Sequence, residues 1–373
     1  MKASTSAKLE KFVRPLIVSL LPPEKVVRIY SEGRKKFLEK MGHDGAGSRE
    51  VNERLKRDLW GITFSSPIMN AAGMDKDFGL YYNFFSQGAG GYICGTTTAN
   101  QRPGNLKDGI RTPFVPYPRS HMASNWLGLP NEGDDVVSKR VLDAKKYSDS
   151  GFPLGVSVMG SPDLQGESKL KGITGGLKKY MVAEANFAEL NESCPNTGEK
   201  PEKSELKERL WYIHDYFLVE RTRNFPVIVK FSNDTKLEQV PSLLDLLFET
   251  GFDGVNFGNT STDYERHRKC VSFGERRAYD FFTKTFGGGV SGRPLKEISL
   301  DLCARAVRHI ETNGPDRKFH VIRCGGIENA WDIKASEDNG ILLNQWFTGY
   351  FERFAIDGHE VYRRLYEELL EMN

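Results

Sequence analysis

The sequence predicts an α/β protein, a (β/α)8 barrel of the TIM type with an N-terminal helical hairpin appended to it. Eight short apolar runs alternate with segments of helical spacing, which is typical of parallel strands joined by right-handed crossovers. Polar or glycine-rich residues follow each run, as expected where barrel strands end. An open doubly wound sheet is less favoured, because Ala71-Ala72-Gly73-Met74, after the first run, is not a G-x-G-x-x-G fingerprint.

The composition narrows the classes of function. Hydrophobic residues make up 39% and charged residues 27% of the 373 residues, which indicates a folded globular protein. With 52 Lys+Arg against 50 Asp+Glu, the net charge of +2 gives no reason to expect a nucleic-acid partner. The odd number of five cysteines argues against a disulfide framework and favours a reducing, cytoplasmic location. No stretch reaches the eighteen or so apolar residues of a membrane span.

Residues 1–45 are predicted to form an amphipathic helical hairpin, separate from a barrel domain over residues 46–373. Apolar residues recur at helical spacing from Val13 to Leu21, Pro22-Pro23 end that helix, and a second helix runs from Glu24 to Met41. A glycine-rich tract, Gly42 to Gly47, separates the pair from the barrel. The hairpin either packs on the main domain or serves as an amphipathic pair that lies on a membrane or guards an apolar tunnel.

The eight predicted strands are the apolar runs, in chain order Pro67–Ala71, Gly91–Cys94, Pro153–Val158, Asn186–Leu190, Pro226–Lys230, Asp253–Phe257, Phe319–Arg323 and Gly340–Asn344. Helical spacing predicts helices at Lys203–Thr222, Leu237–Thr250, Lys296–Thr312 and Tyr350–Met372. The residues just after the strands carry amides, glycines and two lysines, but few carboxylates. They contain no His/Cys/Asp cluster with metal-ligand spacing, so we expect no metal.

Glycine clusters follow the later strands. Gly287 to Gly292 precedes a predicted helix, and Gly325-Gly326 follows the seventh strand. Barrels commonly bind phosphate between the loops after strands seven and eight, where backbone N–H groups point outward. A phosphate-binding nest is therefore predicted from Gly292, Gly325, Gly326, Thr348 and Gly349. The alternative is that these glycines serve only tight turns.

Cys194 differs in its setting from the other cysteines. A single cysteine is usually a buried apolar residue. Cys194 instead lies in a polar segment just past the fourth strand, which suits an exposed, reactive thiol. The amides of Asn191 and Asn196 could grip a flat amide ring. We assign a structural role to the remaining cysteines, Cys94, Cys270, Cys303 and Cys324.

Two lysines stand at strand ends. Lys230 ends the otherwise apolar strand Val227-Ile228-Val229, and burying it without an anionic partner would be costly. Its partner is either a negatively charged cofactor ring or a barrel carboxylate. Lys76 follows the first strand and either holds a substrate carboxylate or is a solvated loop lysine.

Over nearly its whole length the chain resembles the dihydroorotate dehydrogenases, FMN-containing barrel enzymes of pyrimidine synthesis. The order and spacing of the matching segments carry the resemblance: Asn70-Ala71-Ala72-Gly73, Arg102-Pro103-Gly104-Asn105, Asn125 to Asn131, Asn191 to Thr197, Lys230, Asn259-Thr260, Gly289 to Gly292 and Gly325-Gly326.

The resemblance implies definite roles. Cys194 falls on the catalytic base. Dihydroorotate, which the reaction oxidises to orotate, would be bound by Lys76 at its carboxylate and otherwise by Asn125, Leu127, Gly128, Leu129, Asn191, Asn196, Asn259 and Thr260. The FMN ring would contact Ala72, Gly73, Thr96, Asn125, Asn191 and Lys230. The FMN phosphate would be held by Ser291, Gly292, Gly325, Gly326, Phe347, Thr348 and Gly349.

The features that indicate the electron acceptor resemble two different classes of the family. The cysteine base and the Gly128-Leu129-Pro130-Asn131 segment are similar to the soluble class, which uses fumarate or, with an iron–sulfur subunit, NAD. The N-terminal helices and Lys76 are similar to the membrane-associated quinone class, although Gly95-Thr96 and Ser157 depart from the family's patterns. We favour quinone, because an amphipathic hairpin has little use in a purely soluble oxidase.

The expected protein is thus a monomer or homodimer with possible peripheral contact, through residues 1–45, with the inner face of a membrane. Two alternatives stay open. One is another FMN barrel oxidoreductase, such as a dihydropyrimidine or dihydrouridine dehydrogenase. The other is a barrel that binds a phosphorylated ligand without turning it over.

Overall fold

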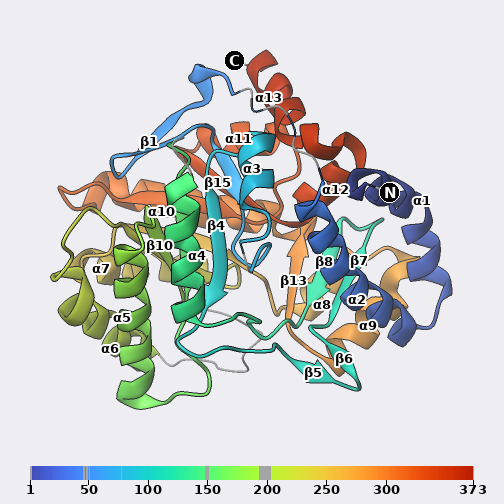
Figure 1. Cartoon of the computed structure of the whole chain (residues 1–373), viewed down its shortest axis with the longest axis horizontal. Coiled ribbons are helices and arrows are strands. Elements are labelled where there is room, and N and C mark those ends of the chain that lie inside the picture. The colour runs from blue at the N-terminus through green and yellow to red at the C-terminus, as the bar shows by residue number, and fades with distance from the viewer. Residues whose placement is uncertain are drawn as a thin grey trace.

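The computed structural model describes residues 2–44, 47, 49, 51–76, 78–147, 151–192 and 203–372. Its centre is an eight-stranded parallel sheet with the order β3-β15-β14-β12-β11-β10-β9-β4, rolled into a barrel (Figure 1). The strands are β3 (Ile68–Asn70), β4 (Tyr92–Thr97), β9 (Leu154–Val158), β10 (Phe187–Asn191), β11 (Val227–Ser232), β12 (Gly254–Asn259), β14 (His320–Cys324) and β15 (Leu343–Trp346). Each of the eight predicted runs overlaps one of these strands, and the predicted (β/α)8 barrel is confirmed.

The barrel closes between its first and second strands, β3 and β4, largely through one side chain. The Asn70 amide donates to the Ile93 carbonyl at 2.7 Å, and its oxygen accepts from the Ile93 N–H at 3.1 Å. A backbone bond of 2.9 Å from Gly90 N to Ile68 O adds to the seam. Asn70 is fully buried, so its amide takes the place of a ladder bond that the short β3 does not supply.

The N-terminal end of the barrel is plugged by a hairpin that the sequence patterns did not predict. Strands β1 (Arg57–Leu59) and β2 (Ile62–Phe64) pair antiparallel. Their apolar side chains form one cluster with residues that point into the barrel: Leu59, Trp60, Phe64, Met69, Ile93, Phe187, Ile228, Ile322 and Leu343. This dry plug leaves the opposite end of the barrel for a site.

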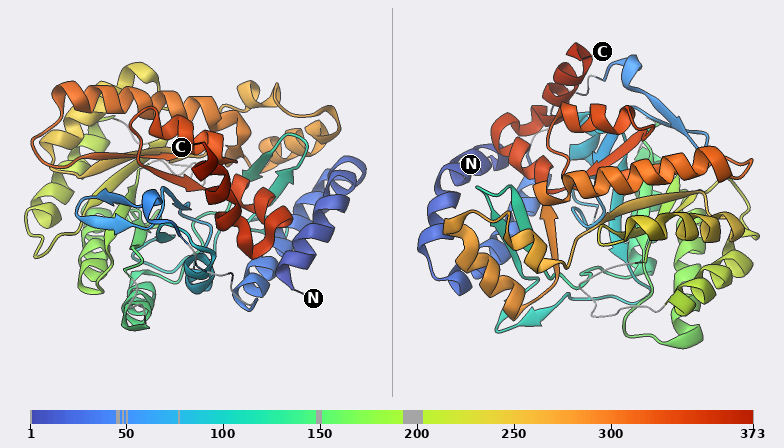
Figure 2. Two further views of the ribbon diagram at one scale, coloured as in Figure 1. Left: turned by 90° about the horizontal axis from the view of Figure 1, so that it is seen from above. Right: turned by 180° about the vertical axis from the view of Figure 1, so that it is seen from behind.

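Helices surround the barrel, as Figure 2 shows from two further directions. They are α3 (Tyr81–Gln87), α4 (Asp134–Tyr147), α5 (Gly166–Val182), α6 (Lys203–Ile213), α7 (Val240–Glu249), α10 (Lys296–Asn313), α11 (Ala330–Glu337), α12 (Thr348–Asp357) and α13 (Val361–Glu371). The single helix predicted over Tyr350–Met372 was wrong in one respect. Gly358 adopts φ +59° and divides the segment into α12 and α13.

A second, three-stranded antiparallel sheet stands beside the barrel, in the order β13-β8-β7. Its strands are β7 (Phe114–Tyr117), β8 (Met122–Asn125) and β13 (Gly289–Gly292), and a small hairpin, β5 (Leu106–Lys107) and β6 (Ile110–Arg111), lies near it. Helices α8 (Tyr264–Arg268) and α9 (Arg276–Thr285) precede β13. The predicted strand pattern missed this sheet, because its strands are short and interrupted by Pro116 and several glycines.

The N-terminal hairpin consists of α1 (Ala3–Leu20) and α2 (Pro23–Gly42), which pack against α12, β7 and α9. Ala3, Ala7, Val18, Val26 and Val27 are among the buried residues on its inner side. Its outer side exposes Leu9, Phe12, Val13, Leu16 and Leu20. The hairpin therefore has both features that the sequence suggested, a packed face and an exposed apolar face. Within the described ranges, no helix has the length and hydropathy to cross a bilayer.

Candidate active site

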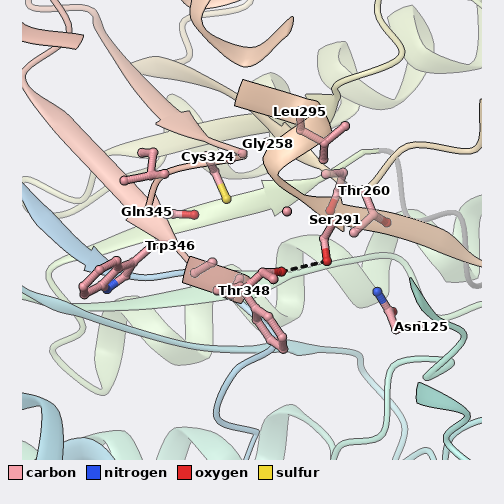
Figure 3. A pocket seen from close by; sticks show the side chains of 18 of the residues that line it. Asn125, Gly258, Thr260, Ser291, Leu295, Cys324, Gln345, Trp346 and Thr348 are labelled. Atoms are coloured by element: carbon pink, nitrogen blue, oxygen red, sulfur yellow. Dashed lines mark hydrogen bonds between the residues drawn. The ribbon is translucent and has the colours of Figure 1, made fainter. Parts of the chain in front are cut away.

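A cavity opens at the C-terminal ends of the barrel strands. Most of the positions singled out in the sequence line it. They come from the C-terminal ends of seven of the eight barrel strands or the segments that follow them, and from the second sheet and the residues after β8. They are Ala72, Gly73, Lys76, Thr96, Asn125, Leu127, Leu129, Asn191, Lys230, Asn259, Thr260, Ser291, Gly292, Gly325, Gly326, Phe347, Thr348 and Gly349. Figure 3 shows several of these side chains around one space.

One end of the cavity is suited to an anion. Helix α12 begins at Thr348 with no acidic residue in its first turn and no side-chain cap, so its first N–H groups are available to a ligand. The hydroxyls of Ser291 and Thr348 lie 3.0 Å apart beside this terminus (Figure 3). Gly349 is required here, because a Cβ atom would lie 2.0 Å from the Ile327 carbonyl oxygen. Gly349 is therefore needed for the close approach of the backbone and also lies in the predicted phosphate-binding nest.

A chain of polar side chains crosses the middle of the cavity. The Asn259 amide donates to Asn191 Oδ1 at 2.7 Å, and the Asn191 amide donates to Thr96 Oγ1 at 3.0 Å. Thr96 and Ser157 share a hydrogen bond of 2.9 Å. Asn125, from β8, lines the same cavity. Its side-chain amide donates to Gly289 O at 3.5 Å. Ser157 thus acts here by holding Thr96.

Lys230 both lines the cavity and forms a buried ion pair. Its ammonium donates to Glu189 Oε1 and to Gln345 Oε1, each at 3.1 Å. Burial acts to lower the pKa of Lys230, but the Glu189 carboxylate outweighs it and the pKa lies above its ordinary value. The sequence left two partners open for Lys230, a cofactor ring or a barrel carboxylate. The structure shows the carboxylate, Glu189, and Lys230 still lines the cavity while it pairs with it.

Three of the predicted site residues are not placed in this cavity. Cys194 and Asn196 lie outside the described residues. The preceding described stretch ends at Glu192, whose carboxylate is held by Arg209 at 2.6 Å. Gly128 stands between two lining leucines without lining the cavity itself. Its φ is +73°, and a Cβ would collide with Asn105.

Among the other cysteines, Cys94 and Cys303 are buried, as expected for structural residues. Cys270 is exposed, and Cys324 is buried but points into the cavity (Figure 3). Burial raises the pKa of the Cys324 thiol, so it is neutral there.

Several lining residues escaped the sequence patterns: His121, Gly258, Leu295, Glu328, Gln345 and Trp346. Glu328 is the most polar of them. Burial acts to raise the pKa of Glu328, but hydrogen bonds from His121, Arg293 and Lys296 outweigh it and bring it to about 2. In the sequence, only its position shortly after Gly325-Gly326 could have indicated that Glu328 lies at the site.

A second cavity, with mostly apolar walls, lies between the hairpin and the barrel. It shares Phe347 and Thr348 with the first cavity. Arg34 of α2 lines it and donates to Gly73 O at 3.2 Å, which ties the hairpin to the rim of the first cavity. Its lining residues are Ser6, Ala7, Glu10, Arg14, Ile29, Tyr30, Gly33, Arg34, Phe37, Phe114, Pro116, Met122, Ala123, Phe347, Thr348, Phe351 and Glu352.

The sequence from residue 54 to residue 371 matches the family model described as dihydroorotate dehydrogenase. The chain belongs to the dihydroorotate dehydrogenase family. Dihydroorotate dehydrogenases are flavin-dependent oxidoreductases, and a cavity at the C-terminal ends of the barrel strands is where barrel enzymes carry out their chemistry.

Relatives and solved structures of dihydroorotate dehydrogenases resemble this chain over most of its length. The dihydroorotate dehydrogenase (quinone) of Halobacterium salinarum is 26% identical over 94% of this chain and 92% of its own. The protein of the same name from Kineococcus radiotolerans is 28% identical over 86% of this chain and 82% of its own. The ligand-free dihydroorotate dehydrogenase of Eimeria tenella superposes with a TM-score of 0.73 at 24% identity, covering 94% of both chains. This last likeness supports the fold.

Proposed function

We propose that the protein oxidises (S)-dihydroorotate to orotate in de novo pyrimidine synthesis, with FMN as cofactor, Cys194 as base and a quinone as electron acceptor. The observation that carries the proposal is the convergence of the positions matched to the family on one cavity at the C-terminal end of the barrel. These positions are far apart in the sequence, and the barrel brings them to one rim with the residue types that match the family.

The described residues fit FMN. The first turn of α12, with Ser291, Thr348 and the glycines at 325, 326 and 349, supplies N–H and hydroxyl donors for a phosphate. Lys230 offers a positive charge on the floor, and Ala72, Gly73 and Trp346 supply small or flat walls for a ring. When bound, FMN supplies the hydride acceptor.

The amide chain is suited to a flat, polar substrate. Asn191, Asn259 and Asn125 present donors and acceptors toward one space, and Lys76 can pair with a carboxylate at its edge. A base must take the proton from C5 of dihydroorotate. A thiol with an ordinary pKa of about 8.5 suits this role better than a serine hydroxyl. In the sequence, Ser193 alone separates Cys194 from Glu192, just after the end of β10, and this closeness to Asn191 supports the assignment.

Quinone as acceptor is supported by the second cavity. Its apolar walls suit an isoprenoid tail, and its shared residues Phe347 and Thr348 bring it to the edge of the first cavity. The exposed apolar face of α1 suits peripheral contact with a bilayer, from which such an acceptor would enter. The relatives' names, dihydroorotate dehydrogenase (quinone), point the same way.

The proposal is tested with the purified full-length protein. We expect it to be yellow, to bleach anaerobically when dihydroorotate is added, and to regain colour faster with ubiquinone or menaquinone than with fumarate or NAD. A colourless protein would contradict the assignment of FMN. A yellow protein that does not bleach would indicate a different substrate. Faster reoxidation by fumarate or NAD would assign the acceptor to the soluble class.

A further inference from the structure

A buried polar layer lies on the floor of the first cavity. It is built by one side chain from each of four barrel strands: Glu189 of β10, Lys230 of β11, Asn256 of β12 and Gln345 of β15. Lys230 and Gln345 line the cavity, whereas Glu189 and Asn256 are fully buried beneath them. Glu189 is therefore a carboxylate set behind the lysine as seen from the ligand.

Both carboxylate oxygens of Glu189 accept hydrogen bonds. Oε1 accepts from Lys230 at 3.1 Å, and Oε2 accepts from the Asn256 amide at 2.7 Å and from the Gln345 amide at 2.9 Å. Three hydrogen bonds thus satisfy the oxygens of this fully buried side chain. The layer is thus organised around one negative charge whose single charged partner in these bonds is Lys230.

Lys230 depends on this carboxylate for its own charge. The amine is only 3% exposed, and buried lysines without a counter-ion lose several units of pKa. The other titratable groups near it do not replace Glu189: Cys324 of β14 is a buried thiol kept neutral, and Lys76 from the loop after β3 carries the same sign as Lys230. The facing groups of β12 and β15, Asn256 and Gln345, carry no charge.

We propose that Glu189 is a positioning residue that keeps Lys230 protonated on the floor of the cavity, so that reduction of a flavin bound there would not be coupled to titration of this lysine. The inference rests on the proposed FMN site, because Lys230 would stabilise the negative charge that the ring gains on reduction. With Glu189 in place, this stabilisation is constant across neutral pH. Without it, the stabilisation disappears above the lowered pKa of the lysine.

The test is the pH dependence of the flavin midpoint potential in Glu189→Gln. Glutamine preserves the shape, and Asn256 Oδ1, which has no hydrogen-bond partner among the described residues, can accept from the new amide after a flip. We expect the difference between variant and wild type to be small at pH 6 and to grow toward pH 9. The relative affinity for reduced over oxidised flavin should fall about tenfold per pH unit, or about 30 mV for a two-electron couple.

The double variant Glu189→Gln/Lys230→Met identifies the titrating group. Its difference from Lys230→Met should stay constant with pH, because no lysine remains to titrate. Two results would overturn the proposal. One is a pH-dependent difference in midpoint potential between the double variant and Lys230→Met, and the other is a pH-independent difference between Glu189→Gln and wild type.

Two further measurements separate a failure of this proposal from a folding defect of the variant and from a failure of the proposed function. If Glu189→Gln does not fold, wild type is compared with Lys230→Met, and their difference must be constant from pH 6 to 9; a change would show that Lys230 titrates despite Glu189. A wild-type protein without flavin absorbance would instead refute the proposed function itself. The two failures are therefore distinguishable.

Discussion

At the scale of single residues, the site depends on small polar side chains that hold one another. Asn191 illustrates this, because its amide is fixed by Thr96 on one side and by Asn259 on the other. A ligand that meets this chain meets groups already oriented, which lowers the entropic cost of binding. The Ser157 hydroxyl acts on the site through Thr96, so a change at this position can be tolerated where the hydroxyl contact is kept.

The proposed base gives the sharpest prediction at this scale. Cys194→Ser should retain bound flavin but slow its reduction by dihydroorotate about 100-fold, and more so at low pH, because a serine hydroxyl is far less easily deprotonated than a thiol. Anaerobic stopped-flow absorbance of the flavin measures this step from pH 6 to 9. Lys178→Gln, an exposed substitution on α5, serves as the control. An unchanged half-reaction at all pH values would remove Cys194 as the base.

At the scale of elements, the N-terminal hairpin contributes one wall of the second cavity and is tied to the barrel by charge. Arg14 of α1 is buried and pairs with Glu10 at 2.6 Å and with Glu352 of α12. Tyr30 of α2 donates to the same Glu10 at 2.9 Å. Helix α12 therefore faces both cavities, with its N-terminus at the first and Glu352 at the second.

Gly33 of α2 offers a way to close the second cavity without touching the first. A Cβ atom added there meets nothing within 4 Å, so a larger side chain would extend into the cavity. We expect Gly33→Leu to lower turnover with ubiquinone at least tenfold, while flavin reduction by dihydroorotate stays unchanged. Gly33→Ala is the matched control, since it should keep quinone turnover and stabilise α2 by about 0.5–1 kcal/mol. Normal quinone turnover in Gly33→Leu would place the acceptor elsewhere.

At the scale of the whole molecule, α1 lies on the hairpin at the edge of the barrel (Figure 1). Its exposed apolar residues, Leu9, Phe12, Val13, Leu16 and Leu20, recur at helical spacing and so share one side of the helix. Phe12 is 75% exposed, and Lys8 and Lys11 are its neighbours in sequence. An apolar face next to basic residues is typical of helices that lie on an anionic bilayer.

Binding to lipid vesicles tests this orientation. Phe12→Glu should reduce co-sedimentation with vesicles of mixed neutral and anionic lipid about tenfold, because a charged group would have to enter the interface. Val182→Glu, an equally exposed change at the end of α5, should leave co-sedimentation unchanged. Equal binding by Phe12→Glu and wild type would exclude α1 as the membrane contact.

Acid stability is a second property of the whole molecule. The pKa of Glu328 is lowered to about 2 by its hydrogen bonds, against the opposing effect of burial. A depressed carboxyl pKa contributes stability that is complete above the unfolded value of about 4.3 and is lost as the pH falls toward 2. The contribution is at most about 3 kcal/mol.

We therefore expect the free energy of unfolding of Glu328→Gln, measured by urea denaturation, to depend less on pH between 5 and 2.5 than that of the wild type. Glu249→Gln, at the end of α7 and on the barrel surface, should follow the wild-type curve. Parallel curves for Glu328→Gln and wild type would show that Glu328 is not the group responsible.

The sequence by itself determined the barrel, the hairpin and most of the residues around the cavity. Strand and helix periods are local properties, and strand ends in a parallel barrel must meet at one rim, so the positions after each run could be assigned to one site. The hairpin was recognised for the same reason, because amphipathic spacing and Pro22-Pro23 are visible in a short stretch of chain.

Only the tertiary structure decided which side chains meet across the barrel. Glu189 sits in the middle of an apolar run and gave no signal until the register of β10 against β11 placed it beside Lys230. Glu328 was missed likewise, because His121, Arg293 and Lys296 come together around it only in the fold. The second cavity arises where α1, α2 and α12 pack together. Such contacts depend on strand register and helix packing, which no local pattern encodes.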